Sequence, residues 1–187
     1  NNPEIDEKVR CMQTHGMTKD PNQMEKIEGP WYYEMHDVGY NYRITDLQCA
    51  LGISQLKRLD RFVNKRRQIA KRYNDSFSKN DLFKTPVANS LIDHAYHLYP
   101  LQIDFEKLQL SKSQFFDKMK QAGINLQVHY IPVHLQPYYR KQFSFKKGDY
   151  PKAEKFYIQE ISLPIYPKLT KNDQNLVIDQ INHIYES

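Results

Sequence analysis

The sequence has little of what several common functional motifs require. It contains only 6 glycines and 2 cysteines, and no GxGxxG, P-loop, GxSxG or HExxH pattern occurs in it. Glycine-rich nucleotide loops, serine-hydrolase elbows and zinc-protease helices are therefore excluded. Cys11 and Cys49 form no CxxC pair, so we expect reduced thiols of a cytoplasmic protein and no metal site.

Long apolar runs are also missing. No stretch approaches the ~18 apolar residues of a membrane helix, so we expect no membrane partner. The first residues, NNPEIDEKVR, are charged and polar, which does not fit a signal peptide. They include no initiating Met and begin in a turn, so we expect further chain upstream.

The charge balance is mildly basic. Lys and Arg number 27 against 22 Asp and Glu, a formal net charge of +5. This is compatible with phosphorylated ligands but weak for a nucleic-acid tail. Over residues 57–72, eight basic residues accompany one acid, Asp60. A solvated helix face is the simplest interpretation, and a nucleic-acid-binding helix is the alternative.

The first part of the chain has helical patterns separated by a loop. Asn2 is a good N-cap for a first helix that ends at Gly16. Residues 17–37 have no periodic pattern and predict a long ordered loop. A Thr-x-x-Gln capping box then opens an apolar repeat over 45–77, which predicts one very long helix or two helices joined at a kink.

Strand-like and helical segments alternate in the second part. The expected strands lie at 94–105, 124–133 and 161–167. The expected helices lie at 111–123, 150–160 and 170–187. This order predicts an α+β fold. The expected division of the chain is 1–44, linker helices at 45–80, and a small domain at 81–187.

The stretch GYNYR at 39–43 places polar and aromatic side chains directly before a helix. A helix N-terminus carries free N–H groups and positive partial charge, so phosphate binds there readily. Asn41 can donate one amide hydrogen bond, and Arg43 can donate two in parallel. The stretch is a candidate phosphate or carboxylate site, with a capped helix bearing surface aromatics as the alternative.

A second candidate site is QVHYIPVHLQPYYR, residues 127–140. Its polar groups and flat rings suit a pocket for a sugar and a nucleobase, although tyrosines filling the edge of a domain fit equally well. The two histidines are five residues apart with a proline between them, so we expect no metal ligation. The candidate substrate residues here are His129, Tyr130, His134, Gln136 and Tyr138.

Taken together, these stretches resemble the C-terminal part of the sugar-nucleotide aminotransferases of the DegT/StrS type, which are pyridoxal-phosphate (PLP) enzymes of fold type I. The similar segments occur in the same order along nearly the whole chain: HGM, VGYNYRITDLQCALGISQLKRLD, RRQIAKRYND, HLYPLQ, GINLQVHYIPVHLQPYYR and ISLPIYPKLT. Within the family they are most similar to the pseudaminic-acid branch. There, glutamate donates the amino group to the C4 keto group of a UDP-linked deoxy-sugar.

The resemblance implies an architecture and partners. Residues 1–44 would be the tail of the large PLP-binding domain, 45–80 the linker helices, and 81–187 a small domain with a short antiparallel or mixed sheet. The enzyme would be a homodimer with shared active sites that takes a nucleotide sugar and glutamate and binds no nucleic acid.

The resemblance also implies residue roles. Asn41 matches the asparagine that reaches across the dimer interface to the phosphate of the neighbour's PLP. Arg43, His129 and Tyr130 match positions that line the sugar-nucleotide pocket.

The family's Schiff-base lysine has no counterpart here. It belongs to a Ser-Phe-His-x-x-Lys-like stretch ahead of a Gly-rich hairpin, and no lysine of this sequence has that context. The resemblance therefore implies that this lysine lies upstream and that the chain is inactive alone. A non-catalytic binding or regulatory protein on the same scaffold is the alternative.

Overall fold

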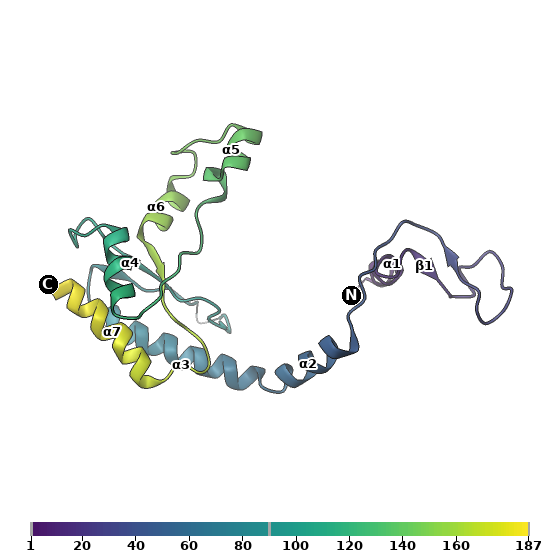
Figure 1. The fold of residues 1–187 in the computed structure, drawn as a ribbon, viewed down its shortest axis with the longest axis horizontal. Coiled ribbons are helices and arrows are strands. Elements are labelled where there is room, and N and C mark those ends of the chain that lie inside the picture. Colours follow the sequence, from purple (N-terminus) through teal and green to yellow (C-terminus); the bar gives the residue numbers. More distant parts are fainter. Residues whose placement is uncertain (1, 90, 187) are drawn as a thin grey trace. The chain divides into compact units, whose positions relative to one another are not determined.

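The computed structural model describes residues 2–89 and 91–186. These divide after Lys57 into an N-terminal unit and a C-terminal unit that begins at Arg58 (Figure 1). Over the described ranges, no helix is long and apolar enough to cross a membrane. The boundary falls between the two helices of the expected linker, and the three-part division stays a prediction.

The N-terminal unit contains two helices and a pair of short strands. These are α1 (Pro3–Met12), β1 (Met17–Thr18), β2 (Glu34–Met35) and α2 (Asp46–Leu56). The Asn2 side chain caps α1 by accepting the N–H of Glu4 at 3.0 Å, as its sequence position predicts. Gly16 has a φ of +73° just beyond the helix, a conformation that glycine adopts without steric cost.

The segment expected to be a long loop is closed by a strand pair. β1 pairs antiparallel with β2, with Met17 opposite Met35. The Glu34 carboxylate organises the intervening turn by accepting the N–H groups of Glu25 at 2.7 Å and Lys26 at 3.1 Å. These bonds, the Glu25 one foremost, lower the pKa of Glu34 to about 2. The segment is otherwise irregular, as predicted, but strands of two residues leave no alternation to detect, and the pairing at its ends was missed.

The apolar repeat over 45–77 forms two helices, α2 and α3 (Leu59–Phe77), rather than one. The predicted capping box is present, because Thr45 Oγ1 accepts the N–H of Gln48 and the Gln48 side chain accepts the N–H of Thr45. The chain leaves α2 at Lys57 and enters α3 after Arg58.

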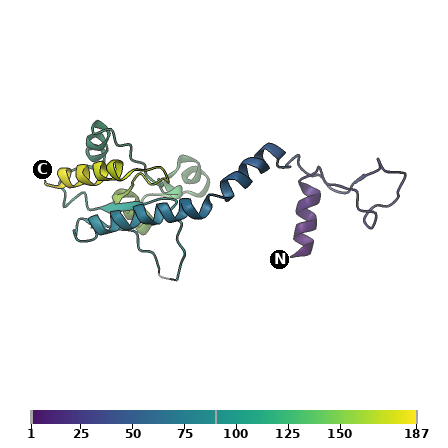
Figure 2. The same ribbon diagram turned by 90° about the horizontal axis from the view of Figure 1, so that it is seen from below.

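The C-terminal unit is built on a three-stranded antiparallel sheet. Its strands are β3 (Phe83–Lys84), β4 (Pro100–Ile103) and β5 (Glu160–Ser162), in the order β3–β4–β5. Side chains of one face share a core with those of three helices, α3, α4 (Lys112–Gln121) and α7 (Lys171–Glu186). Figure 2 shows α7 running alongside α3. The α+β fold is confirmed.

The sheet has an apolar inner face and a polar outer face. Leu101, Ile103 and Ile161 are fully buried in the core. Because side chains alternate along a strand, Gln102 and its β5 neighbour Glu160 point the other way. The outer face is thus free to carry polar groups that a hydrophobic core would not tolerate.

Three short helices follow α4. They are η1 (Val133–Leu135), α5 (Pro137–Phe143) and α6 (Pro151–Gln159). Helix α6 was predicted, and the other two were missed. The expected strand at 124–133 makes only one bridge, between Gln127 and Ser162. It cannot continue as a strand, because the N–H of His129 is bound to Glu160 and Pro132 has none.

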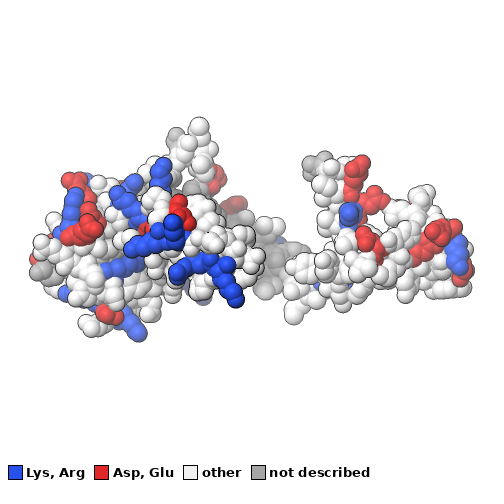
Figure 3. Space-filling view, turned by 90° about the horizontal axis from the view of Figure 1, so that it is seen from above, with Lys and Arg blue, Asp and Glu red and all other residues white. Residues whose placement is uncertain are grey.

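The basic run of α3 is partly structural. Arg66 Nη1 donates to three backbone carbonyls, those of Tyr96, His97 and Ile165. Arg67 pairs with Asp93 and donates to the carbonyl of His94. Figure 3 shows the Lys and Arg atoms of this unit in several groups with Asp and Glu atoms among them. Two arginines of this helix therefore hold neighbouring loops.

Candidate functional site

The GYNYR stretch is held against the end of α1 by main-chain contacts. Gly39 passes so close that a Cβ on it would lie 2.2 Å from the backbone nitrogen of Gly16. A Cβ on Gly16 would lie 1.9 Å from the carbonyl oxygen of Asp37. Two glycines are therefore required where the two segments cross, which is a concrete use for a scarce residue.

Backbone hydrogen bonds fix the residues on either side of Asn41. Tyr40 donates to the Met12 carbonyl at 2.6 Å, and Tyr42 donates to the Gln13 carbonyl at 2.9 Å. Asn41 itself forms a bridge with Thr14. The main chain at Asn41 is thus positioned by its neighbours, whatever its side chain does.

The side chains of Asn41 and Arg43 are exposed. Across residues 2–89 and 91–186, no hydrogen bond or ion pair uses either side chain. Capping of α2 is carried out by Thr45 and Gln48 instead. The cap therefore does not account for Asn41 and Arg43, which offer donors to a group from outside the unit.

His129 lies in the C-terminal unit above the polar face of β5. Its Nδ1 is 2.7 Å from Oγ of Ser162, and its N–H donates to Oε2 of Glu160 at 3.1 Å. The ring is half-buried and contacts the ring of Tyr130, with centroids 4.8 Å apart. These bonds leave Nε2 as the ring nitrogen available to a ligand.

Lys112 lies at the start of α4 and contacts Tyr157 of α6. Its Nζ donates to the carbonyl of Tyr157 at 2.6 Å and lies 4.8 Å from the centroid of that ring. Burial lowers the pKa of Lys112, and the charge of Glu160 opposes this effect. The ammonium of Lys112 is thus held by Tyr157 of α6.

His134 lies in a different environment. It is buried, and its Nε2 is 2.8 Å from Oε1 of Glu154. Oε1 also accepts the N–H of Gly148 at 2.8 Å, and these bonds, His134 first, lower the pKa of Glu154. The pair ties η1 to α6. This favours a structural role for His134, and its contact with a substrate stays a prediction.

The remaining candidates are Tyr130, beside His129, and Gln136 and Tyr138, at the start of α5. Tyr130 and Tyr138 are 71% and 69% exposed, so both rings are open to a partner. Gln136 is partly buried and stands at the N-terminus of α5, where its carbonyl accepts the N–H of Arg140. Tyr130 is thus adjacent to His129, whereas Gln136 and Tyr138 are placed with η1 and α5.

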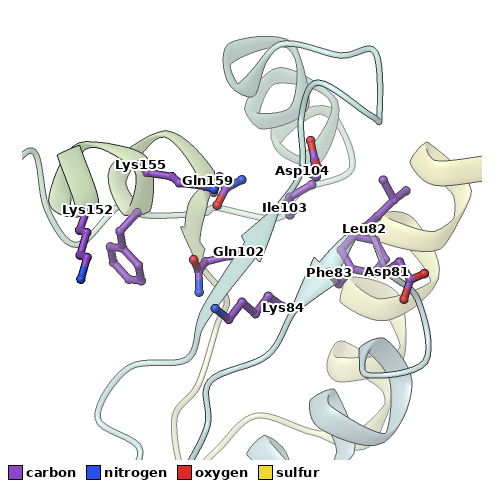
Figure 4. A pocket seen from close by; sticks show the side chains of 11 residues that line it. Asp81, Leu82, Phe83, Lys84, Gln102, Ile103, Asp104, Lys152, Lys155 and Gln159 are labelled. Atoms are coloured by element: carbon purple, nitrogen blue, oxygen red, sulfur yellow. The ribbon is translucent and has the colours of Figure 1, made fainter. Parts of the chain in front are cut away.

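A groove of about 480 Å³ opens on the outer face of the sheet, but it contains none of the candidate residues. Figure 4 shows Lys84 and Gln102 on the sheet side, and Lys152, Lys155 and Gln159 on α6. The candidate site therefore rests on the surroundings of His129 and on the GYNYR stretch.

Sequence reasoning missed Glu160 and Ser162. The available signal was two polar residues alternating with isoleucine and leucine in EISL, a pattern in which polar side chains share one face of a buried strand. The partner of that face, His129, is 31 residues from Glu160 in sequence, and a single sequence does not reveal such a pairing.

The fold is that of about half of an aminotransferase. The whole chain superposes on 47% of PseC, an aminotransferase of pseudaminic acid biosynthesis from Helicobacter pylori, with a TM-score of 0.84 and 28% identity. It likewise covers 47% of Spr1654 from Streptococcus pneumoniae in its PMP-form, with a TM-score of 0.84 and 27% identity. A model of the DegT/DnrJ/EryC1/StrS aminotransferase family matches residues 1–182. The chain belongs to this family.

Curated relatives agree with this assignment. The chain is 44% identical to MJ1066 of Methanocaldococcus jannaschii, a protein named as uncharacterized, over 98% of its own length and 47% of the relative's. It is 40% identical to the spore coat polysaccharide biosynthesis protein SpsC of Bacillus subtilis, over 97% and 47%. It is 34% identical to a UDP-4-amino-4,6-dideoxy-N-acetyl-beta-L-altrosamine transaminase of Campylobacter jejuni, over 99% and 46%. The chain spans about half the length of each.

Proposed function

We propose that the intact protein is a PLP-dependent aminotransferase that transfers an amino group from glutamate to the C4 keto group of a nucleotide-linked deoxy-sugar. The observation that carries this proposal is the family match over residues 1–182. Support comes from the GYNYR stretch. Hydrogen bonds hold its main chain, while the side chains of Asn41 and Arg43 are exposed and make no hydrogen bond to the described residues. A cytoplasmic location, expected from the cysteines, belongs to the proposal.

The substrate we propose is of the UDP-4-keto-6-deoxy-N-acetyl-altrosamine type, as in pseudaminic acid biosynthesis. This is supported by the transaminases of Campylobacter jejuni and Helicobacter pylori at 34% and 32% identity. It is also supported by the likeness to PseC. MJ1066 and SpsC are more similar in sequence and carry no such name, so the nucleotide sugar is the part of the proposal that needs direct assay.

The residues of the N-terminal unit fit one part of PLP, its phosphate. Asn41 can donate an amide N–H and Arg43 a charged guanidinium, and both are exposed on a backbone fixed by its neighbours. Hydrogen bonds between such donors and an anion are strong and directional. When bound, PLP supplies the electron sink that makes amino transfer feasible. In the proposed homodimer, Asn41 holds the phosphate bound in the neighbouring subunit, and Arg43 contacts the sugar nucleotide.

The residues of the C-terminal unit bind and orient the sugar nucleotide. His129 offers Nε2, and Tyr130 offers an exposed ring and hydroxyl for stacking and hydrogen bonding. Gln136 and Tyr138 are proposed to extend the contacts along α5. His134 is proposed to act at this site mainly by holding η1 in place through Glu154. The Schiff-base lysine is proposed to lie upstream, so the chain alone is inactive.

The two half-reactions of a ping-pong enzyme give a direct test. We expect the intact protein to convert bound PLP with glutamate alone and then to form a 4-amino sugar when the UDP-linked 4-keto sugar is added. Mass spectrometry of the sugar nucleotide checks the product. PLP binding without amino transfer to any nucleotide-linked keto-sugar would contradict the proposed activity and would favour a non-catalytic protein on the same scaffold.

A further inference from the structure

A buried carboxylate lies directly beneath His129. Glu160 and Ser162 are two residues apart on β5, so both point to the outer face of the sheet. Glu160 is fully buried, and Ser162 is 5% exposed. Burying a carboxylate costs free energy unless hydrogen bonds or a counter-charge satisfy it. The partners of Glu160 therefore indicate what the carboxylate does.

Both oxygens of Glu160 act on His129. Oε2 accepts the N–H of His129 at 3.1 Å, and Oε1 lies 2.5 Å from Oγ of Ser162. Oγ of Ser162 lies in turn 2.7 Å from Nδ1 of His129. The bond to the backbone N–H fixes the main chain at His129, and the bond to Ser162 fixes the orientation of the imidazole ring.

Counting protons along this chain of bonds assigns the tautomer of the ring. An ionised carboxylate only accepts hydrogen bonds, and a serine hydroxyl has one proton to donate. Both oxygens of Glu160 act as acceptors here, Oε2 for the N–H of His129 and Oε1 for the hydroxyl of Ser162. Ser162 then donates to Glu160 and accepts from His129, so Nδ1 carries the ring proton. Nε2 of the neutral ring is left as an acceptor.

We infer that Glu160 and Ser162 are positioning residues that hold His129 in the Nδ1–H tautomer and present Nε2 as a hydrogen-bond acceptor to a donor group of the substrate. A sugar hydroxyl or an amide N–H of a nucleotide sugar is such a donor. The inference rests on the proposed function, which places His129 in the substrate pocket. It predicts that the ring is oriented before the substrate binds, which favours tight recognition.

The tautomer is measured in the intact holoenzyme labelled with ¹⁵N-histidine. Long-range ¹H–¹⁵N correlation spectra distinguish a protonated ring nitrogen from a bare one, and the signals of His129 are those lost in His129→Gln. At neutral pH we expect a protonated Nδ1 and a bare Nε2. A ring that carries its proton on Nε2 would overturn the inference without any measurement of activity.

Substitution of Ser162 tests whether the orientation matters for binding. Ser162→Ala removes the link, so the His129 signals should shift toward the Nε2–H tautomer. The KM for the sugar nucleotide should rise about threefold to tenfold, the range of one ordinary hydrogen bond. The glutamate half-reaction should not change. Ser162→Thr retains the hydroxyl and should restore both readings.

A serine outside the site is the matched control. Ser76 donates to the carbonyl of Arg72 at 2.9 Å within α3, so Ser76→Ala removes a partly buried hydroxyl of the same kind. It should change neither the His129 spectrum nor the KM. An equal change in Ser76→Ala would mean that the Ser162→Ala result reports a general loss of stability, and would reject the positioning role.

His129→Ala separates this inference from the proposed function. If His129→Ala raises the KM for the sugar nucleotide but Ser162→Ala moves the tautomer without changing the KM, His129 contacts the substrate and the positioning role is wrong. If neither changes the KM, the placement of His129 in the pocket is itself wrong. If Ser162→Ala fails to fold, two results still test the positioning role. These are the tautomer of His129 in the wild type, and the tautomer and KM of Ser162→Thr.

Discussion

The two units of the chain differ in how they are held together. Among the described residues, every buried hydrophobic side chain lies in the C-terminal unit, where sheet and helices enclose a continuous core. The N-terminal unit exposes its apolar side chains, including Val38 at 78% and Leu47 at 82%. Its order comes instead from main-chain hydrogen bonds and from the close crossing of two backbone segments at Gly16 and Gly39.

This difference indicates different roles. A unit with its own core is expected to fold by itself and to provide a rigid support for His129. A unit whose helix α2 exposes Leu47, Leu51, Ile53 and Leu56 needs another surface to cover it, since exposed apolar patches of this kind mark interaction sites. The proposed homodimer offers such a surface close to the GYNYR stretch, where the sequence resemblance places a contact between subunits.

The largest effect is expected from a core substitution in the C-terminal unit. The Phe77 side chain is fully buried and packs against the ring of Phe83, with centroids 5.3 Å apart. Phe77→Ala leaves a cavity and should lower the free energy of unfolding by about 3–5 kcal/mol. Chemical denaturation followed by circular dichroism measures this. A loss below about 1 kcal/mol would mean that the core is less tightly packed than described.

Substitution of the exposed leucines of α2 tests the other side of the comparison. Leu47→Gln with Leu51→Gln should leave the unfolding of the C-terminal unit unchanged, because both side chains are exposed. Each leucine buried between subunits contributes about 1.5–3 kcal/mol. The dissociation constant of the dimer should therefore rise tenfold or more. Analytical ultracentrifugation of the intact protein measures it. A dimer as stable as the wild type would place the interface elsewhere.

A third prediction concerns Asn41, whose side chain has no partner among the described residues. In the intact protein, Asn41→Ala should weaken PLP retention by about 1.5–3 kcal/mol, the range for a hydrogen bond to a charged group. The fold should be unaffected, because the main-chain bonds on either side of Asn41 remain. Dialysis with spectroscopic quantification of retained PLP measures the change, and Tyr42→Phe, which removes an exposed hydroxyl next to Asn41, is the control.

Mixed dimers make that prediction sharper. A subunit carrying Asn41→Ala can be combined with a subunit in which the proposed Schiff-base lysine is replaced. The heterodimer then contains one site with both groups intact if Asn41 acts across the interface. We expect partial recovery of activity in such heterodimers. Heterodimers that form and stay inactive would contradict the cross-subunit role.

How far the sequence predicts the structure also differs between the units. Local signals were sufficient for the starts of α1, α2 and α4. Asn2 and Thr45 cap their helices as predicted, and α4 begins directly after Ser111, the first residue of the expected helix. Short pairings were not predictable, because β1, β2 and β3 have two residues each and leave no periodic pattern. The sequence therefore predicts where helices begin better than which strands pair.

The candidate site follows the same rule. GYNYR was recognisable because its residues are adjacent in sequence, and their exposure agrees with a contact outside the unit. The surroundings of His129 and His134 depend on Glu160 and Glu154, which are 31 and 20 residues away. Two histidines of one motif thus occupy different environments, one half-buried and one buried, which spacing alone does not distinguish.

The smallest effect on stability is expected in the turn of the N-terminal unit, which is ordered by hydrogen bonds to one carboxylate and not by a hydrophobic core. Glu34 accepts the N–H groups of Glu25 and Lys26, and its pKa is lowered from 4.5 to about 2. Because the folded pKa lies below the unfolded one, the contribution of Glu34 to the order of the turn is fully present above about pH 4.5. It is lost as the pH falls through about 2.

Hydrogen exchange at the amides of Glu25 and Lys26, corrected for intrinsic rates, should therefore show protection that decreases over this window. Glu34→Gln cannot titrate and should show lower protection with no such dependence. If wild type and Glu34→Gln gave the same pH profile, Glu34 would not be what orders this turn.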